Sequence, residues 1–306
     1  MNVSVVLPSF NRARLLPITI PTYFQEDVSE VILVDDCSSD NTAEVVKELQ
    51  TRFPTLRYFR NEVNSKQPYT QNVAISKVQS EYIYFGDDDS VLYPGSIRNL
   101  LNVMREKNAD IVGGRALALF FPEQIDELDE FLSHYRNRIA TEANQIVDLS
   151  TLSTNFTYTV KEPIKVPFCH ASCLCKTQVA REMQFDVKIE GNAYREETDF
   201  LIRATLAGYT IYYTSSANQI NLPSAMCSGG ARSKNHRHWA ENAIRNNDYF
   251  IDKNYDSMQK MFSLPRTKDE MKALFRVHEN IDFCRCFAQY ICVYDGRGRV
   301  ILPIGA

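Results

Sequence analysis

The feature that most constrains the fold is a short apolar segment that ends abruptly in three aspartates. Residues 82–85 are aromatic or β-branched, a composition typical of a buried strand, and Gly86, Asp87, Asp88 and Asp89 follow at once. Adjacent carboxylates repel one another, so a strand that ends in them needs a compensating cation close by. In an open α/β sheet, ligands bind beyond the carboxyl ends of the strands, where these acids would lie.

Two interpretations of this acidic triplet stay open at this point. Carboxylate oxygens are hard ligands, suited to magnesium or manganese rather than to zinc. Alternatively, the acids form a solvated turn before a helix over residues 94–107, where Pro94 suits the first helical position and negative charge suits the helix dipole. The triplet alone does not decide between a metal site and a turn.

Further strands and helices place the triplet in a sheet. Residues 3–7 and 31–34 are short apolar runs, and the second ends in the acids Asp35 and Asp36. A third strand is predicted over residues 56–60, and helices over residues 13–24, 43–49, 69–77, 177–183 and 196–207. Strands alternating with helices predict a parallel sheet, with turn residues and acids delivered to one of its edges.

Four ordered stretches then give the chain a resemblance to a known family. They are VVLPSFNR, VILVDDCSSDNT, YIYFGDDDSVLYP and EETDFLIRATLAGY, and they extend over roughly residues 3 to 215. In their order and approximate spacing they resemble the nucleotide-sugar glycosyltransferases of family 2, which have the GT-A fold. The resemblance implies an α/β protein with a Rossmann-like, mixed and mostly parallel sheet flanked by helices, followed by a helical C-terminal extension.

The domain organisation that we expect follows this resemblance. A GT-A domain is expected over residues 1–230, with a nucleotide-sugar-binding half over 1–120 and an acceptor-binding half over 121–230. Residues 231–306 are expected to form a flexible basic loop and a C-terminal helical extension. An apolar stripe on a helix predicted over residues 268–293 would pack on the main body or mediate a homodimer.

Composition narrows the protein class. With 306 residues, 44% of them hydrophobic and 24% charged, the chain is ordinary for a soluble globular protein. A net charge of −4 gives no electrostatic reason to expect a nucleic acid as partner. Since no apolar run approaches the length of a membrane span, we expect a cytoplasmic protein, with contact to a membrane surface left open. The eight cysteines include no CxxC pair, so free thiols are expected.

The resemblance assigns the nucleotide side of the site. The loop that begins at Pro8 would line the nucleobase pocket, with Phe10 against the base and Arg12 near the phosphates. Asp36 would accept a hydrogen bond from a ring N–H of the base. The family's usual Arg-Asn pair is replaced here by Gln-Asn, and Lys66 would supply the displaced positive charge, unless it is only a solvated lysine.

The resemblance also gives the acidic triplet separate roles. Asp89 would be the metal ligand, and Asp87 or Asp88 would contact the ribose. A bound Mn²⁺ or Mg²⁺ would stabilise the negative charge that builds up on the departing diphosphate. The protein would hold only part of the ion's coordination shell, because phosphate oxygens and waters complete it.

The fourth stretch carries the expected catalytic base. Family members read Glu-Asp-x-Asp there, and the second acid is the base, which corresponds to Glu197 in this chain. Glutamate keeps the chemistry but moves the carboxylate by about one methylene, which matters because a base must lie within hydrogen-bond reach of its proton. The alternative is that these acids only favour the helix dipole, an explanation that suits one or two acids better than three.

Three more residues are candidates for contacts to the diphosphate or the acceptor. His170 falls in a strand predicted over residues 166–176 and would contact donor or acceptor, unless it is a satisfied core histidine. Arg232 and His236 belong to a basic loop that resembles loops closing over the diphosphate in some relatives, and His236 would add a metal ligand. A mobile surface loop is the alternative.

The function implied is that of a metal-dependent, inverting glycosyltransferase. It would move a sugar from a nucleoside-diphosphate-sugar of the UDP type to a hydroxyl of a glycan, a lipid-linked sugar or a small molecule. One alternative is a catalytically silent nucleotide-sugar or glycan-binding module. A nucleotidyltransferase is another, although it would need a glycine-rich phosphate loop, and residues 8–14 contain no glycine. The absence of GxGxxG after the first strand disfavours dehydrogenases.

Overall fold

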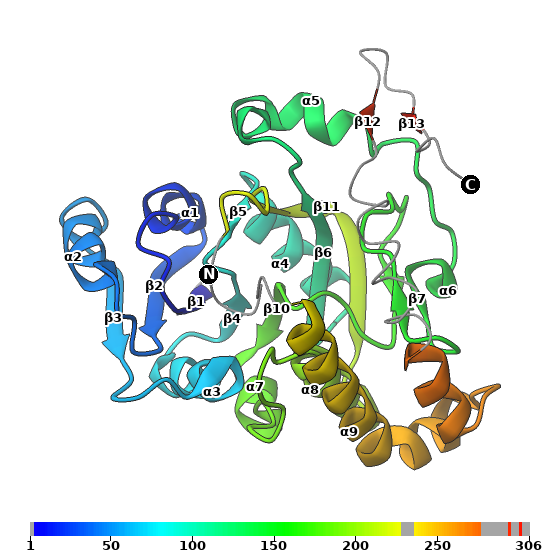
Figure 1. The fold of residues 1–306 in the computed structure, drawn as a ribbon. Coiled ribbons are helices and arrows are strands. Elements are labelled where there is room, and N and C mark those ends of the chain that lie inside the picture. The colour runs from blue at the N-terminus through cyan, green and yellow to red at the C-terminus, as the bar shows by residue number, and fades with distance from the viewer. Residues whose placement is uncertain (1–2, 228–235, 277–292, 295–299, 302–306) are drawn as a thin grey trace.

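The computed structural model describes residues 3–227, 236–276, 293–294 and 300–301. Within these residues, nine strands form one sheet in the order β3-β2-β1-β4-β10-β6-β11-β5, with β9 paired to β11 (Figure 1). The strands are β1 (Val3–Ser9), β2 (Val28–Asp35), β3 (Leu56–Arg60), β4 (Tyr82–Phe85), β5 (Ser90–Leu92), β6 (Ile111–Ala118), β9 (Ile164–Lys165), β10 (Cys173–Lys176) and β11 (Ile211–Asn221). Two short pairs lie apart from it, β7 (Val147–Asp148) with β8 (Ser153–Thr154) and β12 (Val293–Tyr294) with β13 (Val300–Ile301).

The direction of the strands brings several loops to one edge of the sheet. Strands β3, β2, β1 and β4 run parallel, so their carboxyl ends lie together. Strand β10 runs antiparallel between β4 and β6, and β6 pairs in parallel with β11. The mixed, mostly parallel sheet predicted from the sequence is therefore confirmed.

Side chains that alternate along the strands feed two cores, one on each face of the sheet. In β1, Val5 and Leu7 point into one core and Val6 into the other. Helices α1 (Leu16–Tyr23), α2 (Thr42–Arg52) and α4 (Ser96–Glu106) pack on the first face. The second face is covered by α3 (Lys66–Lys77), α7 (Thr177–Met183), α8 (Glu196–Leu206) and α9 (His236–Phe262) (Figure 1).

The turn into the acidic triplet depends on a close approach at Gly86. A Cβ atom on this residue would lie 2.7 Å from Leu7 Cδ2 and 2.9 Å from Tyr23 Cε1, well inside van der Waals contact. Both neighbours are fully buried, so neither has space to move aside. Only glycine fits at this position, where the chain leaves β4 and places three acids at the edge of the sheet.

Several predicted boundaries are wrong, for identifiable reasons. Helix α1 begins at Leu16 instead of residue 13, because the chain first makes a turn around Asn11, whose φ is 55°. Pro94 was expected to be the first residue of a helix, but α4 begins at Ser96. It follows Gly95, whose backbone has a left-handed conformation. Of the strand predicted over 166–176, only Cys173–Lys176 pairs in the sheet. Between β6 and β7 the chain forms three short helices, η1 (Pro122–Glu127), α5 (Leu128–Ser133) and α6 (Ala143–Ile146).

The C-terminal part is described only in segments. Helix α9 extends from His236 to Phe262, and residues 268–276, the first part of the helix predicted over 268–293, are also helical. Most of the apolar stripe expected to mediate a homodimer lies outside the described residues, so the homodimer stays a prediction, as do the boundaries at 120/121 and 230/231. Among the described helices, none is both long enough and apolar enough to cross a membrane.

Candidate functional site

The loops after β1 and β2 are joined by Asn11. Its backbone N–H donates to Ser38 Oγ at 2.8 Å, and its side-chain oxygen accepts from the amide of Ser39 at 2.7 Å and, at 3.3 Å, from that of Asp40. Asparagine tolerates the left-handed conformation that this arrangement requires. Asn11 therefore holds two strand-end loops against each other, and it does not cap the following helix.

Arg12 is the cation that lies beside the acidic triplet. Its Nε is 3.5 Å from Asp88 Oδ1, and a terminal nitrogen is 3.8 Å from Asp89 Oδ2. Burial raises the pKa of Asp88 to about 7, repulsion from Asp89 adds to this rise, and the charge of Arg12 opposes it. The charge of Arg12 thus offsets part of the effect that burial and repulsion have on Asp88.

A divalent cation fits this donor set. Within the described residues, no three His, Cys, Asp or Glu side chains are placed to enclose a metal ion. From this part of the chain, one or two carboxylates could serve as ligands, a number usual for magnesium and manganese bound together with a diphosphate. Burial and repulsion from Asp89 raise the pKa of Asp88, and a bound cation would counter both by favouring the ionised carboxylates.

Asp87 is held in place by neighbours from distant parts of the chain. Its Oδ2 accepts hydrogen bonds from Gln219 Nε2 at 2.7 Å and from Ser172 Oγ at 3.1 Å. The hydroxyl of Tyr23 donates to its backbone oxygen at 2.8 Å. The side chain of Gln219 is itself fixed, because its Oε1 accepts from Tyr84. Asp87 is consequently held in one position by contacts from three other segments.

Asp36 anchors the loop that leads into α3. Its Oδ1 accepts from Asn61 Nδ2 at 2.9 Å and from the amide of Ser65 at 2.8 Å, and its Oδ2 accepts from the amide of Lys66 at 2.8 Å. The Lys66 amine donates to Asn64 Oδ1. A carboxylate offers about four lone-pair sites, so one acceptor site on Oδ2 is left over. Pro8, in β1, and Phe10, just after it, are half-buried at the same edge.

The two glutamates at the start of α8 have different surroundings. Among the described residues, Glu196 Oε2 is one of few buried side-chain atoms with no hydrogen-bond partner. Burial raises the pKa of Glu196 well above its usual value, and repulsion from Glu197 and Asp87 raises it further. Burial also raises the pKa of Glu197, although a backbone hydrogen bond at Glu197 and the charge of Arg195 oppose this rise. The neutral form is therefore favoured more at Glu196 than at Glu197.

Glu197 and His170 line the same pocket. This cavity of about 270 Å³ has aromatic walls from Phe156, Phe168 and Tyr194. The ring of Phe156 meets that of His170 edge to face, with centroids 5.9 Å apart. The arrangement places an acid and an imidazole beside apolar surface, next to the loop that contacts the triplet through Ser172. The pocket suits a small polar molecule with an apolar face.

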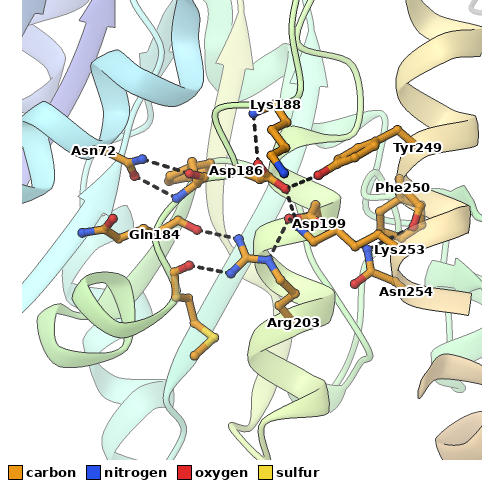
Figure 2. Close-up of polar contacts among 12 residues, drawn as sticks. Asn72, Gln184, Asp186, Lys188, Asp199, Arg203, Tyr249, Phe250, Lys253 and Asn254 are labelled. Carbon is orange, nitrogen blue, oxygen red and sulfur yellow. Dashed lines mark hydrogen bonds and ion pairs between the residues drawn. The ribbon is translucent and has the colours of Figure 1, made fainter. Parts of the chain in front are cut away.

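Helix α8 is fastened to α9 by a buried ionic network (Figure 2). Asp199, fully buried on α8, accepts from Asn254 Nδ2 at 2.8 Å. Its other oxygen lies 2.7 Å from Arg203 Nε and 2.9 Å from Lys253 Nζ. Lys253 also pairs with Asp186 at 2.6 Å. The last acid of the EETD stretch therefore fixes the position of the helix whose first turn carries Glu197.

Other candidates do not enter this site or cannot be placed. Arg232 lies outside the described residues, as does the side chain of His236, which begins α9. A second cavity, of about 580 Å³, lies between α1, β5 and the start of α4 and is lined by none of the predicted site residues. The five cysteines in the described part are free thiols, and four of them are buried.

Sequence reasoning missed four residues of the site. They are Ser172, Arg195, Gln219 and Asn247. Arg195 lines the pocket in a left-handed conformation and donates to Asn247 Oδ1 at 3.1 Å, so it links α8 to α9. Gln219 lies in β11 among other polar residues, such as Asn218 and Asn221, so no pattern in the sequence marks it. The other contacts join segments that the sequence does not show to be neighbours.

Known proteins resemble the chain over its N-terminal part. The family model described as glycosyl transferase family 2 matches residues 4–174. The chain is 33% identical over 114 residues to the GalNAc(5)-diNAcBac-PP-undecaprenol beta-1,3-glucosyltransferase of Campylobacter jejuni, over 36% of this chain and 37% of that protein. It is 32% identical over 121 residues to the poly(ribitol-phosphate) beta-N-acetylglucosaminyltransferase TarP of Staphylococcus aureus, over 37% of this chain and 36% of that protein. These alignments span little more than a third of each relative.

Solved structures share the fold over almost the whole chain. TarS 1-349 of S. aureus in complex with UDP-GlcNAc superposes with a TM-score of 0.58 at 15% identity, covering 96% of this chain and 77% of that one. The mannosyltransferase PcManGT from Pyrobaculum calidifontis, in complex with GDP-Man and Mn²⁺, gives a TM-score of 0.59 at 15% identity, over 94% and 75%. At such identities the likeness supports the fold alone.

Proposed function

Because the chain belongs to glycosyl transferase family 2 and has the GT-A fold, we propose that it moves a sugar from a nucleoside-diphosphate-sugar to an acceptor hydroxyl with inversion. The observation that carries this proposal is the adjacency of two acidic sites. The acidic triplet lies at the end of β4, and Glu197 lines the pocket of about 270 Å³ that also contains His170. Ser172 lies between them, since its hydroxyl contacts Asp87 and its amide contacts His170.

The nucleoside would bind over the ends of β1 and β2. Pro8 and Phe10 supply half-buried apolar surface for a base, and Asp36 has one acceptor site left for a ring N–H. The ribose would lie against Asp87 or Asp88. In this assignment Asp36 has two roles. It would bind the base, and the three hydrogen bonds that it accepts fix the loop up to Lys66.

The diphosphate would lie between the triplet and the cations near it. Asp89 would hold a Mn²⁺ or Mg²⁺ ion, whose charge stabilises the departing diphosphate when the ion is bound. Arg12 is already placed beside two of the acids, and Lys66 would supply further positive charge from the start of α3. Contacts from Arg232 or His236 remain predictions, because their side chains lie outside the described part of the chain.

Glu197 would act as the general base. It takes the proton of the acceptor hydroxyl, whose oxygen attacks the anomeric carbon as the bond to the diphosphate breaks. The raised pKa of Glu197 suits this role, because a base with a pKa nearer the working pH drives proton transfer more effectively. A single in-line displacement of this kind inverts the anomeric configuration.

The substrates proposed here come from the relatives. The C. jejuni relative is named for a PP-undecaprenol substrate and TarP for poly(ribitol-phosphate), and TarS was solved with UDP-GlcNAc. We therefore propose a UDP-type donor and a lipid-linked or polymeric acceptor for this chain. A protein that works on such acceptors would act at the surface of a membrane, as a peripheral protein on its cytoplasmic side.

A binding module without activity is the second candidate. It is favoured by one observation, that glutamate replaces the family's aspartate and has a raised pKa, which would leave more of the base protonated. Release of UDP from UDP-sugars, measured with and without Mn²⁺, separates the two. Metal-dependent release supports the enzyme, whereas UDP-sugar binding with no release under any condition supports the module.

A further inference from the structure

The position of the ring proton on His170 is set by its neighbour Ser172. The backbone N–H of Ser172 donates to His170 Nδ1 at 3.1 Å. Since an amide N–H can only donate, Nδ1 must be the unprotonated nitrogen, and the neutral ring carries its hydrogen on Nε2. A residue that lines the pocket beside Glu197 is therefore a hydrogen-bond donor.

The loop that carries His170 is held firmly on both sides. Cys169 packs against Gly113 of β6 so closely that a Cβ on the glycine would lie 2.5 Å from that of the cysteine. On the other side, the Ser172 hydroxyl is bonded to Asp87 at 3.1 Å. The Phe156 ring meets the imidazole edge to face. These contacts fix the donor before any substrate arrives, which lowers the cost of ordering it on binding.

Within a small volume the pocket thus places the acceptor Glu197 and the donor His170 beside apolar walls, and Ser153, Thr154, Arg195 and Thr198 complete its polar lining. Its volume of about 270 Å³ is close to the lower end of small-molecule sites, so it suits a single small unit. Glu197 accepts a proton from one hydroxyl. A second N–H bonded to that same oxygen would withdraw electron density from the attacking atom, so the donor of His170 is better matched to a neighbouring hydroxyl. Phe156 and Phe168 would face the C–H groups.

We propose that this pocket binds two adjacent hydroxyl groups, a vicinal diol, on a sugar or alditol unit of the acceptor. The inference rests on the proposed function, since it assumes that Glu197 deprotonates the acceptor. One hydroxyl gives its proton to Glu197 and bonds to the anomeric carbon, while the nucleoside diphosphate leaves with the electron pair of the broken bond. The oxygen of the other hydroxyl accepts the Nε2–H of His170, which keeps its proton throughout.

The test pairs His170→Phe with acceptors that lack one hydroxyl. The acceptors are methyl hexopyranosides and ribitol 5-phosphate, each tested beside its monodeoxy analogues with a UDP-sugar as donor. For each variant, the rate of transfer to the acceptor is divided by the rate at which the same variant hydrolyses the donor. Loss of one neutral hydrogen bond should lower kcat/KM for the acceptor about tenfold in His170→Phe. Removing the adjacent hydroxyl should cost the parent enzyme a similar factor and cost His170→Phe nothing more.

His170→Gln is the matched variant, because its side-chain amide keeps an N–H donor, and it should recover most of the lost transfer. Equal thermal unfolding midpoints confirm that both variants fold. Transfer to the pyranosides or to ribitol 5-phosphate tells which kind of unit carries the diol. If the loss from His170→Phe and the loss from removing the adjacent hydroxyl multiply, the two groups act independently and the inference is wrong. It is also wrong if the parent hydrolyses the donor but transfers sugar to none of the probes. If the parent neither hydrolyses nor transfers, the proposed function itself is wrong, and the inference falls with it.

Discussion

At the scale of single residues, three consecutive aspartates have three different environments. Asp87 is fixed by Gln219 and Ser172, Asp88 pairs with Arg12, and Asp89 lies at the outer reach of the same arginine. The sequence predicts a charged strand end, but it cannot assign these partners. Gln219 is 132 residues away from Asp87, and the contact exists only because β11 and β5 pair in the folded sheet.

The first prediction concerns Asp89. In Asp89→Ala, Mn²⁺-dependent binding of UDP should weaken by at least about 10- to 100-fold, the loss usual for a group that supports a metal. The fold should persist, because the substitution removes one of three repelling charges. Calorimetric titration of UDP at fixed Mn²⁺ measures the effect, with Glu123→Ala, an exposed acid on η1, as control. Parent-like binding by Asp89→Ala would remove this residue from the metal site.

The second prediction is a pH dependence set by Glu197. A general base works only when ionised, so transfer is lost as the pH falls through its pKa. Burial raises the pKa of Glu197 above the ordinary value of 4.5. The acid limb of kcat/KM for the acceptor, measured at saturating donor from about pH 4 to about pH 8, should therefore have its midpoint above that value. A midpoint at or below the ordinary value would speak against Glu197 as the base.

At the scale of elements, the position of Glu197 depends on how α8 and α9 are joined. Asp199 lies two residues after Glu197, and its carboxylate is tied to Lys253 and Asn254 on α9 (Figure 2). Burial raises the pKa of Asp186, but hydrogen bonds from Lys253, the Lys188 amide and Tyr249 outweigh it and lower that pKa overall. The network therefore favours the ionised form of Asp186, and the ion pairs of Lys253 with Asp186 and Asp199 stabilise the contact between the helices.

The third prediction compares two lysines that pair with acids of α8 and α9. Lys253→Met leaves the buried Asp199 short of one charged partner and should lower the free energy of unfolding by about 2 kcal/mol. Lys272 pairs with Asp252, which is exposed, so Lys272→Met should cost less than about 1 kcal/mol. Urea unfolding measures both losses. Equal losses would mean that the buried network does not join the helices more strongly than a surface ion pair.

At the scale of the whole molecule, local signals predict elements well and loops poorly. Strand β3 and helix α7 occur over the predicted residues, because apolar runs and turn residues mark both ends. The apolar stretch from residue 166 was expected to be a strand, yet it is a loop up to Ser172. This segment is buried because it packs against β6 and forms part of the pocket wall. Its apolar composition indicates burial but does not distinguish such packing from pairing in a sheet. His170 thereby lies in a pocket instead of in a strand.

The same limit applies to the candidate site. Acids at strand ends and at the start of α8 are local features, so Asp36, the triplet and Glu197 could be predicted from their positions and from the family resemblance. Ser172 joins the acidic triplet to the pocket, because its hydroxyl contacts Asp87 and its amide contacts His170, and these contacts follow from the relative placement of β4 and β10. No pattern of residue types near Ser172 reports that placement.

The most direct test of the account is sugar transfer by Glu197→Gln beside Glu196→Gln. Glutamine at residue 197 keeps the shape but takes no proton, so transfer should fall by about 10²- to 10⁴-fold while UDP-sugar binding with Mn²⁺ persists. Glu196→Gln should change little, because burial favours the neutral form of Glu196, which glutamine imitates. The parent's product should have the inverted anomeric configuration. Full transfer by Glu197→Gln, together with its loss in Glu196→Gln, would contradict the central claim and move the base by one residue.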